Sequence, residues 1–207
     1  MSENHRILKA AGLIGGLTLC SRIAGLIRDA VIGYLFGTGA AADAFFVAFR
    51  VPNLVRRFVA EGAMGAAFVP VFSDYLVRRG REPALEAARA VLAVVSVCLA
   101  LFVLAGILLA PRWVPILAPG FLSNPTKLVL TTRLTQFLFA YVFFVSVTAL
   151  LGAFLNACRH FAAPAASPIL LNAAIIGAAV ALSPHLTNPV YALVLGVLVG
   201  GALQIAL

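Results

Sequence analysis

The chain has 207 residues, of which 63% are hydrophobic and only 11% are charged, and its mean hydropathy is +1.07. This composition excludes an ordinary soluble domain, which could not bury so much apolar surface, and it favours an integral membrane protein. The formal net charge of +8 indicates anionic partners such as lipid head groups or phosphates. Nucleic acid is the less favoured partner, because the basic residues lie between hydrophobic segments and no basic tail or aromatic-basic module accompanies them.

Six apolar segments approach or exceed the roughly 20 residues that an α-helix needs to cross a bilayer. They predict an all-α integral membrane protein whose residues 1–207 form one lobe of six transmembrane helices. We expect these helices at 7–36, 41–76, 89–110, 134–155, 167–182 and 190–207. Because the chain stops at GGALQIAL, without a basic stop or polar tail, we expect it to be a fragment of a longer membrane protein.

The first two segments are longer than the bilayer requires, so their helices must tilt, kink or project from it. Pro52 predicts a kink in the second segment, because it cannot donate to the carbonyl of Ala48 and its ring crowds that carbonyl. The fifth segment has a helix start signal, with Ser167 as N-cap and Pro168 at the first helical position. Two glycine-containing stretches, GLIGG at 12–16 and VLVGG at 197–201, predict small-residue faces for close helix packing.

Seven basic residues flank the predicted spans on one side of the membrane and three on the other. The positive-inside rule therefore predicts a cytoplasmic N-terminus. The seven are Arg6, Lys9, Arg78, Arg79, Arg81, Arg89 and Arg159, and the three are Arg112, Lys127 and Arg133.

Charged residues inside the first two predicted helices are the most informative feature of the sequence. They are the five arginines Arg22, Arg28, Arg50, Arg56 and Arg57 and the three acids Asp29, Asp43 and Glu61. An arginine at the bilayer centre costs about 2.5 to 3.5 kcal/mol, so these side chains must face partners or an aqueous cavity. Pairing leaves two positive charges in excess, and guanidinium groups in a cavity are suited to bidentate capture of phosphate or carboxylate oxygens.

Helical spacing indicates which of these charges share a face. Arg22 and Asp29 are seven residues apart and lie on one face, whereas Arg57 and Glu61, four apart, are the expected structural ion pair. An alternative is that the arginines are interfacial anchors or structural pairs. The apolar sequence on both sides of Arg22 and Arg28 favours the cavity for these two.

Other signals in the sequence favour structural roles. Asn156 and Asn172 lie on apolar helices and are expected to bond to neighbouring helices. The three histidines and three cysteines have neither metal nor disulfide spacing, and no nucleophile-base or paired-carboxylate arrangement is present. We therefore expect no catalytic residue, no metal and no cofactor.

Several motifs resemble a known family over essentially the whole chain. The segment 21–75, which contains FFVAFRVPNLVRRFVAEGA, strongly resembles the amino-terminal signature of the MurJ (MviN) lipid II flippases. LAPGF at 117–121, GAFLNACRHF at 152–161 and PAASPILLN at 164–172 also match. The family belongs to the multidrug/oligosaccharidyl-lipid/polysaccharide (MOP) exporter superfamily.

The resemblance implies a MOP-type transporter with two six-helix lobes around a cationic cavity, of which this chain is the N-terminal lobe. It implies that Arg22, Arg28 and Arg56 are the substrate-binding arginines of the cavity, with Asp43 as the aspartate of the DAFF motif. Arg50 occupies a position that is lysine in some relatives. The following residues are assigned to the gate or to ion pairs: Asp29, Arg57 and Glu61.

The function implied is that of a lipid II flippase in the bacterial inner membrane. Such a protein moves the undecaprenyl-pyrophosphate-linked peptidoglycan precursor to the periplasmic leaflet by alternating access. The expected partners are lipid II, membrane lipids and the C-terminal lobe. Two alternatives stay open: a related exporter of another lipid-linked glycan or drug, and a membrane enzyme acting on polyprenyl pyrophosphates.

Overall fold

The computed structural model describes residues 3–58, 64–158 and 160–207, and their side chains over 12–56, 68–158 and 160–207. This part of the chain contains α-helices and short 3-10 turns and no strand, which confirms the all-α class. The helices are α1 (Glu3–Phe36), α2 (Ala40–Phe58), α3 (Met64–Arg79), α4 (Arg81–Leu117), α5 (Pro125–Ala157), α6 (Ala162–Leu182) and α7 (Tyr191–Ala206). Two 3-10 turns, Pro119–Phe121 and Ser183–His185, join α4 to α5 and α6 to α7.

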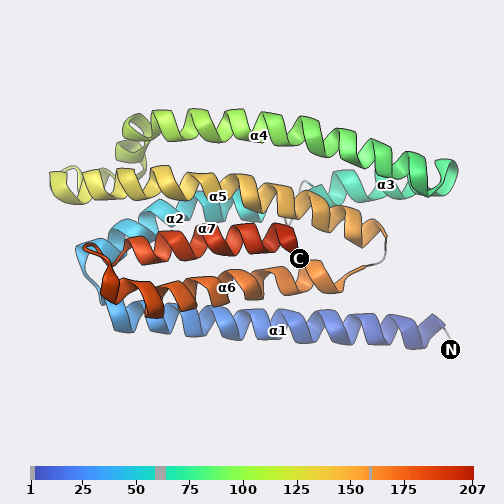
Figure 1. Ribbon diagram of the computed structural model, residues 1–207, viewed down its shortest axis with the longest axis horizontal. Helices are drawn as coiled ribbons and strands as arrows, with labels where there is room; N and C mark the ends of the chain where they lie inside the picture. The colour runs from blue at the N-terminus through green and yellow to red at the C-terminus, as the bar shows by residue number, and fades with distance from the viewer. Residues whose placement is uncertain (1–2, 59–63, 159) are drawn as a thin grey trace.

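The helices run back and forth along one long axis, with α4 and α1 on opposite flanks of the bundle (Figure 1). Helix α5 is central, because it packs against α2, α4 and α7, while α6 packs between α1 and α7. The buried core joins α5 to α1, α2, α6 and α7. Its fully buried members include Leu134, Leu138, Phe45, Ile175 and Leu193.

Glycines of α7 allow it to approach α6 very closely. A Cβ atom at Gly196 would lie 2.7 Å from the Cα of Ile175, and one at Gly200 would lie 3.0 Å from the Cα of Leu171. The prediction of close packing at VLVGG is therefore confirmed. The same prediction for GLIGG is wrong within the described residues, since a Cβ at Gly12, Gly15 or Gly16 would meet nothing within 4 Å.

Several helices begin or end at other residues than predicted. The predictions followed the apolar segments that match the bilayer thickness, but a helix can continue beyond such a segment. The predicted helix at 89–110 is part of α4, which begins directly after Gly80. The predicted 134–155 helix is part of α5, which begins at Pro125 because the Asn124 side chain caps the amide of Lys127. Two helices, α2 and α3, occupy the range predicted as 41–76, and residues 59–63 between them are outside the described part.

The predicted start of the fifth helix is wrong. Helix α6 begins at Ala162, so Ser167 is not its N-cap and Pro168 lies inside the helix. Pro164 falls in the first turn, where its missing N–H removes no helical hydrogen bond. The chain can therefore start the helix five residues before the predicted N-cap.

Within the described residues, three helical segments are long and apolar enough to cross a membrane: Arg81–Leu117, Pro125–Ala157 and Ala162–His185. Helix α7 is a shorter apolar helix. These segments are consistent with a multi-pass membrane protein, and the count of six spans stays a prediction.

Candidate anion-binding groove

The arginines of α1 and α2 line a continuous groove between these two helices. Helix α1 packs along α6 and α2 packs along α5, while α1 and α2 touch only slightly. Two cavities, of about 410 Å³ and about 340 Å³, lie in the space between them. Both cavities are lined by Arg28, Phe49, Asn53 and Arg56, so we treat them as one groove.

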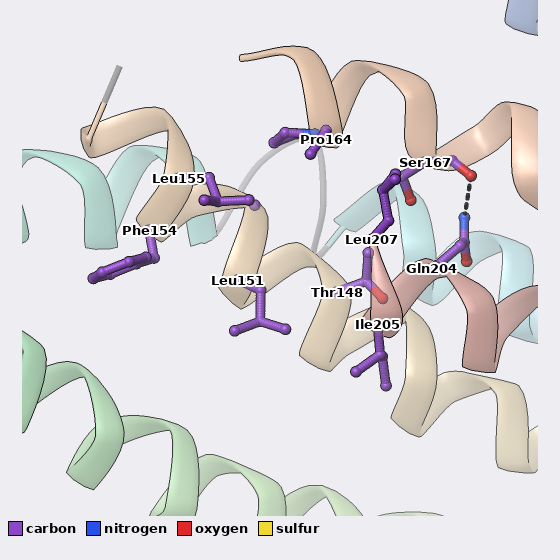
Figure 2. Close-up of a pocket in the computed structure, with 11 residues that line it drawn as sticks. Thr148, Leu151, Phe154, Leu155, Pro164, Ser167, Gln204, Ile205 and Leu207 are labelled. Carbon is purple, nitrogen blue, oxygen red and sulfur yellow. Dashed lines mark hydrogen bonds between the residues drawn. The ribbon is translucent and has the colours of Figure 1, made fainter. Parts of the chain in front are cut away.

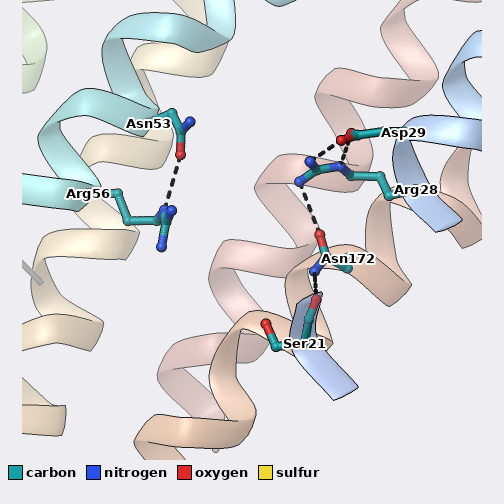
Figure 3. Close-up of polar contacts among 6 residues, drawn as sticks. All are labelled: Ser21, Arg28, Asp29, Asn53, Arg56 and Asn172. Atoms are coloured by element: carbon teal, nitrogen blue, oxygen red, sulfur yellow. Dashed lines mark hydrogen bonds and ion pairs between the residues drawn. The ribbon is translucent and has the colours of Figure 1, made fainter. Parts of the chain in front are cut away.

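Arg28 is held in place by two oxygen acceptors. Its Nε and Nη2 donate to Oδ1 of Asp29 at 2.9 and 2.7 Å, and its Nη1 donates to Oδ1 of Asn172 at 3.0 Å. The Asn172 amide in turn donates to the backbone oxygen of Ser21 at 3.3 Å, as Figure 3 shows. Asn172 therefore ties α1 to α6, which confirms its predicted role in joining helices. The Arg28 side chain is 23% exposed, so part of it still faces the groove.

Gly25 lies beside this connection. A Cβ atom at this position would lie 3.7 Å from Nδ2 of Asn172, which is an ordinary van der Waals distance. The face of α1 between Arg22 and Arg28 is therefore in contact with the asparagine of α6.

Arg56 and Arg50 come from α2, on the other side of the groove. The Nε of Arg56 donates to Oδ1 of Asn53, one turn earlier in the helix, at 3.1 Å (Figure 3). Arg56 also lines a smaller cavity of about 150 Å³ together with Asn156 and Gln204. Arg50 is exposed and lines the larger cavity of the groove.

Arg22 lies on α1 and lines the groove with Arg28 and Arg56. It was predicted to share a helix face with Asp29, and the Asp29 carboxylate forms its ion pair with the neighbouring Arg28, whose long side chain can reach it. No described residue forms a hydrogen bond or ion pair with Arg22. Its guanidinium is therefore available to a ligand.

The groove carries a strong surplus of positive charge. Among the described residues that line it, there are four arginines, Arg22, Arg28, Arg50 and Arg56, and one carboxylate, Asp29. Guanidinium groups on two facing helices can donate to different oxygens of one anion, and phosphate and carboxylate match their planar geometry. The arrangement therefore favours a multiply charged anion.

Asp43 lies elsewhere, at the start of α2. Its Oδ2 accepts a hydrogen bond from the Lys127 ammonium at 2.6 Å, and this ammonium also lies 4.1 Å from the ring centroid of Phe121. Asp43 is not among the described residues that line the groove. Its assignment to the substrate stays a prediction, as does the Arg57–Glu61 pair, whose side chains are outside the described part.

Sequence reasoning missed the aromatic wall of the groove. Phe45, Phe46 and Phe49 line the larger cavity, and the rings of Phe45 and Phe49 stack with centroids 5.7 Å apart. The i, i+4 spacing of these two rings was visible in the sequence and indicates one helix face. The spacing alone does not distinguish a helix face that lines a cavity from one that contacts lipid.

Gln204 of α7 was also missed. Its side chain is buried, accepts from the Tyr141 hydroxyl at 3.3 Å and donates to the backbone oxygen of Ser167 at 3.0 Å. It lines the groove and also an apolar cavity of about 240 Å³ between α5, α6 and α7, which Figure 2 shows. Gln204 is therefore a polar residue that lines both the groove and the apolar cavity.

A family model described as lipid II flippase MurJ matches residues 32–207 of the chain. The chain belongs to the lipid II flippase MurJ family. The lipid II flippase MurJ of Burkholderia cenocepacia is 40% identical over 96% of this chain. The probable lipid II flippase MurJ of Buchnera aphidicola subsp. Baizongia pistaciae is 39% identical over 96% of it.

A solved structure has the same fold over nearly the whole chain. It is that of a lipid II flippase MurJ in an inward closed conformation, with a TM-score of 0.74 and 26% identity, and the match covers 94% of this chain and 40% of that chain. The curated relatives are also longer, since the chain spans 38% of the Burkholderia protein and 39% of the Buchnera protein.

Proposed function

We propose that this chain is the N-terminal lobe of a lipid II flippase, a transporter and not an enzyme. The observation that carries the proposal is the groove of four arginines and one carboxylate between α1 and α2. Lipid II has a pyrophosphate between its polyprenyl tail and its sugar-peptide head. The pyrophosphate is the multiply charged anion that such a groove would bind.

The arginines have different roles in this proposal. Arg28, fixed by Asp29 and Asn172, provides a preorganised donor at one wall. Arg22 and Arg50 are exposed and can turn toward the bound phosphates. A fixed donor loses little conformational entropy on binding, whereas the exposed donors adapt to the anion as it moves.

The groove alone does not complete a transport cycle. Alternating access requires two bodies that rock against each other, and we propose that a C-terminal lobe provides the second body. The polyprenyl tail would stay in the bilayer while the charged head crosses between the lobes. We place the protein in the bacterial inner membrane with a cytoplasmic N-terminus, on the basis of the seven-to-three distribution of basic residues.

The test replaces each groove arginine in the protein expressed from its full-length gene. Arg22→Ala, Arg28→Ala and Arg56→Ala should each fail to support growth of a strain depleted of its own flippase. A hydrogen bond to a charged group contributes about 1.5 to 3 kcal/mol, so lipid II affinity should fall roughly tenfold to a hundredfold.

The matched control is Arg79→Ala, which removes an exposed arginine at the end of α3 and should leave growth unchanged. Protein levels are measured for every variant by immunoblot. Normal growth of all three groove variants at normal levels would defeat the proposal.

A further inference from the structure

A second basic cavity lies away from the groove, where the ends of α3, α4 and α5 meet. Its volume is about 460 Å³. In Figure 1 these helix ends lie together at the right-hand end of the bundle. The cavity is lined by Phe72, Leu76, Arg81, Leu85, Phe154, Leu155, Cys158 and His160.

The walls of this cavity are apolar and aromatic. Phe72 of α3 packs against Phe154 of α5 with ring centroids 4.9 Å apart, and Phe68 stacks on Phe72 with centroids 5.4 Å apart. Leu76 and Leu85 belong to the two helices that meet at the turn between α3 and α4. Such walls favour a hydrocarbon chain and would lose free energy if they held only water.

The polar part of the lining is basic. Arg81 and His160 line the cavity, and none of the described lining residues is acidic. Gly80, with φ of 83°, turns the chain sharply between α3 and α4, and this turn places Arg81 at the first position of α4.

Arg81 differs from the two arginines that precede Gly80. Arg78 is already bonded to Asp74 at 2.8 Å, and the Arg79 guanidinium lies over the Tyr75 ring at 5.8 Å. No described residue forms a hydrogen bond or ion pair with Arg81. Its charge is therefore free to meet a ligand.

The depth of the cavity in the membrane determines what kind of ligand fits. The apolar run of α5 ends at Phe154 and Leu155, and the polar Asn156, Arg159 and His160 follow within five residues. The cavity therefore lies at the level where hydrocarbon gives way to head groups. A ligand there needs an apolar part, next to the phenylalanines and leucines, and an anionic part, next to Arg81.

We propose that this cavity binds an anionic phospholipid, with its phosphate on Arg81 and the first part of one acyl chain between Leu76, Leu85 and Phe154. If a soluble phosphate bound instead, the apolar residues that line the cavity would stay in contact with water. A zwitterionic lipid would bring its own cation close to Arg81 and lose most of the attraction. The basic residues around this end also mark it as the side that we expect to face the cytoplasm, where anionic lipids give the leaflet its negative potential.

This site is separate from the arginine groove, and it does not rest on the proposed transport of lipid II. The test uses the protein expressed from its full-length gene and purified in a neutral detergent. Native mass spectrometry measures the dissociation constants of dioleoyl phosphatidylglycerol and dioleoyl phosphatidylcholine. The tightest site should prefer phosphatidylglycerol, and Arg81→Gln should weaken its binding about fivefold, the effect expected for one basic residue near the membrane surface.

Two further variants separate charge from shape. Arg112→Gln removes an exposed arginine near the other end of α4 and should leave the affinity unchanged. Leu76→Trp fills the cavity and should weaken binding without changing the charge, with folding checked by circular dichroism. If Leu76→Trp does not fold, the comparison of the affinities of Arg81→Gln and Arg112→Gln for phosphatidylglycerol still tests the proposal.

Equal affinities for the two lipids would overturn the proposal, as would equal effects of Arg81→Gln and Arg112→Gln. Displacement of the lipid by millimolar glycerol phosphate would also overturn it, because the site would then take a soluble anion. Retained phosphatidylglycerol in the presence of glycerol phosphate supports the lipid assignment.

Discussion

Helices α4 and α5 are neighbours and both are apolar enough to cross a membrane, but they differ greatly in burial. Only 6% of the most apolar window of α4 is buried within the bundle, compared with 56% for α5. Helix α4 lies on the flank of the bundle (Figure 1), whereas α5 contacts α2, α3, α4, α6 and α7. The more apolar of the two helices is thus the less buried one.

The difference shows that a helix's hydropathy does not predict how deeply it is buried in this bundle. Helix α5 carries buried polar residues that its neighbours shield from the surroundings, and several of them donate to backbone oxygens. Thr131 and Thr135 donate to carbonyls one turn earlier, each at 2.7 Å, and Gln136 donates to the backbone oxygen of Ile107 on α4 at 3.2 Å. Helix α4 is mostly exposed on the flank of the bundle and has few such residues, and unsatisfied polar groups on a surface inside a bilayer would be costly.

The largest effect that this comparison predicts is the loss of a buried leucine from α5. Leu138 is fully buried, so Leu138→Ala should lower the free energy of unfolding by about 2 kcal/mol or more through lost packing contacts. On α4, Leu108 is mostly exposed, and Leu108→Ala should change it by less than about 0.5 kcal/mol. Unfolding in mixed detergent micelles measures both, and equal losses would contradict the different burial of the two helices.

The second prediction concerns Gly106 of α4, which lies against the Phe139 ring of α5. A Cβ atom at Gly106 would lie 2.0 Å from Cε1 of Phe139, and the Phe139 ring is itself packed against Phe102 and Trp113. Gly106→Ala should therefore push the helices apart and cost about 1 to 3 kcal/mol. The control is Gly177→Ala on α6, where a Cβ meets nothing within 4 Å; a loss as large there would mean that the effect of Gly106→Ala is not steric.

The smallest expected effect is at the start of α5, where Lys127 joins it to Asp43 of α2. Lys127→Met keeps the apolar stem near Phe121 and removes the ion pair, whose carboxylate side chain is 51% exposed. We expect a loss of about 0.5 to 1 kcal/mol that decreases at high salt. Arg78→Met breaks an ion pair within α3 whose two partners are both exposed and should cost less. A larger loss for Arg78→Met would show that the tie between α2 and α5 adds nothing.

The candidate site was predictable to different degrees. The clustering of Arg22, Arg28 and Arg56 followed from their place in apolar helices, because charges there must find a cavity or a partner. The contact of Asp43 with Lys127 joins residues 84 positions apart, and helical spacing contains no information about such a pair. Helical spacing placed Asp29 on one face with Arg22 but gave its carboxylate no partner, and its ion pair with Arg28 depends on the reach of a long side chain.

The same distinction holds for the whole protein. Composition and the placement of basic residues were sufficient for the helical class, the membrane setting and the surplus of arginines, because each depends on the transfer of individual side chains between water and lipid. The groove, its phenylalanine wall and the cavity beside Arg81 required the tertiary structure. Each of these depends on how far apart two helices lie. That distance is determined by residues that meet from distant parts of the chain, such as Gly196 against the backbone of Ile175 or the Asn172 amide on the backbone oxygen of Ser21.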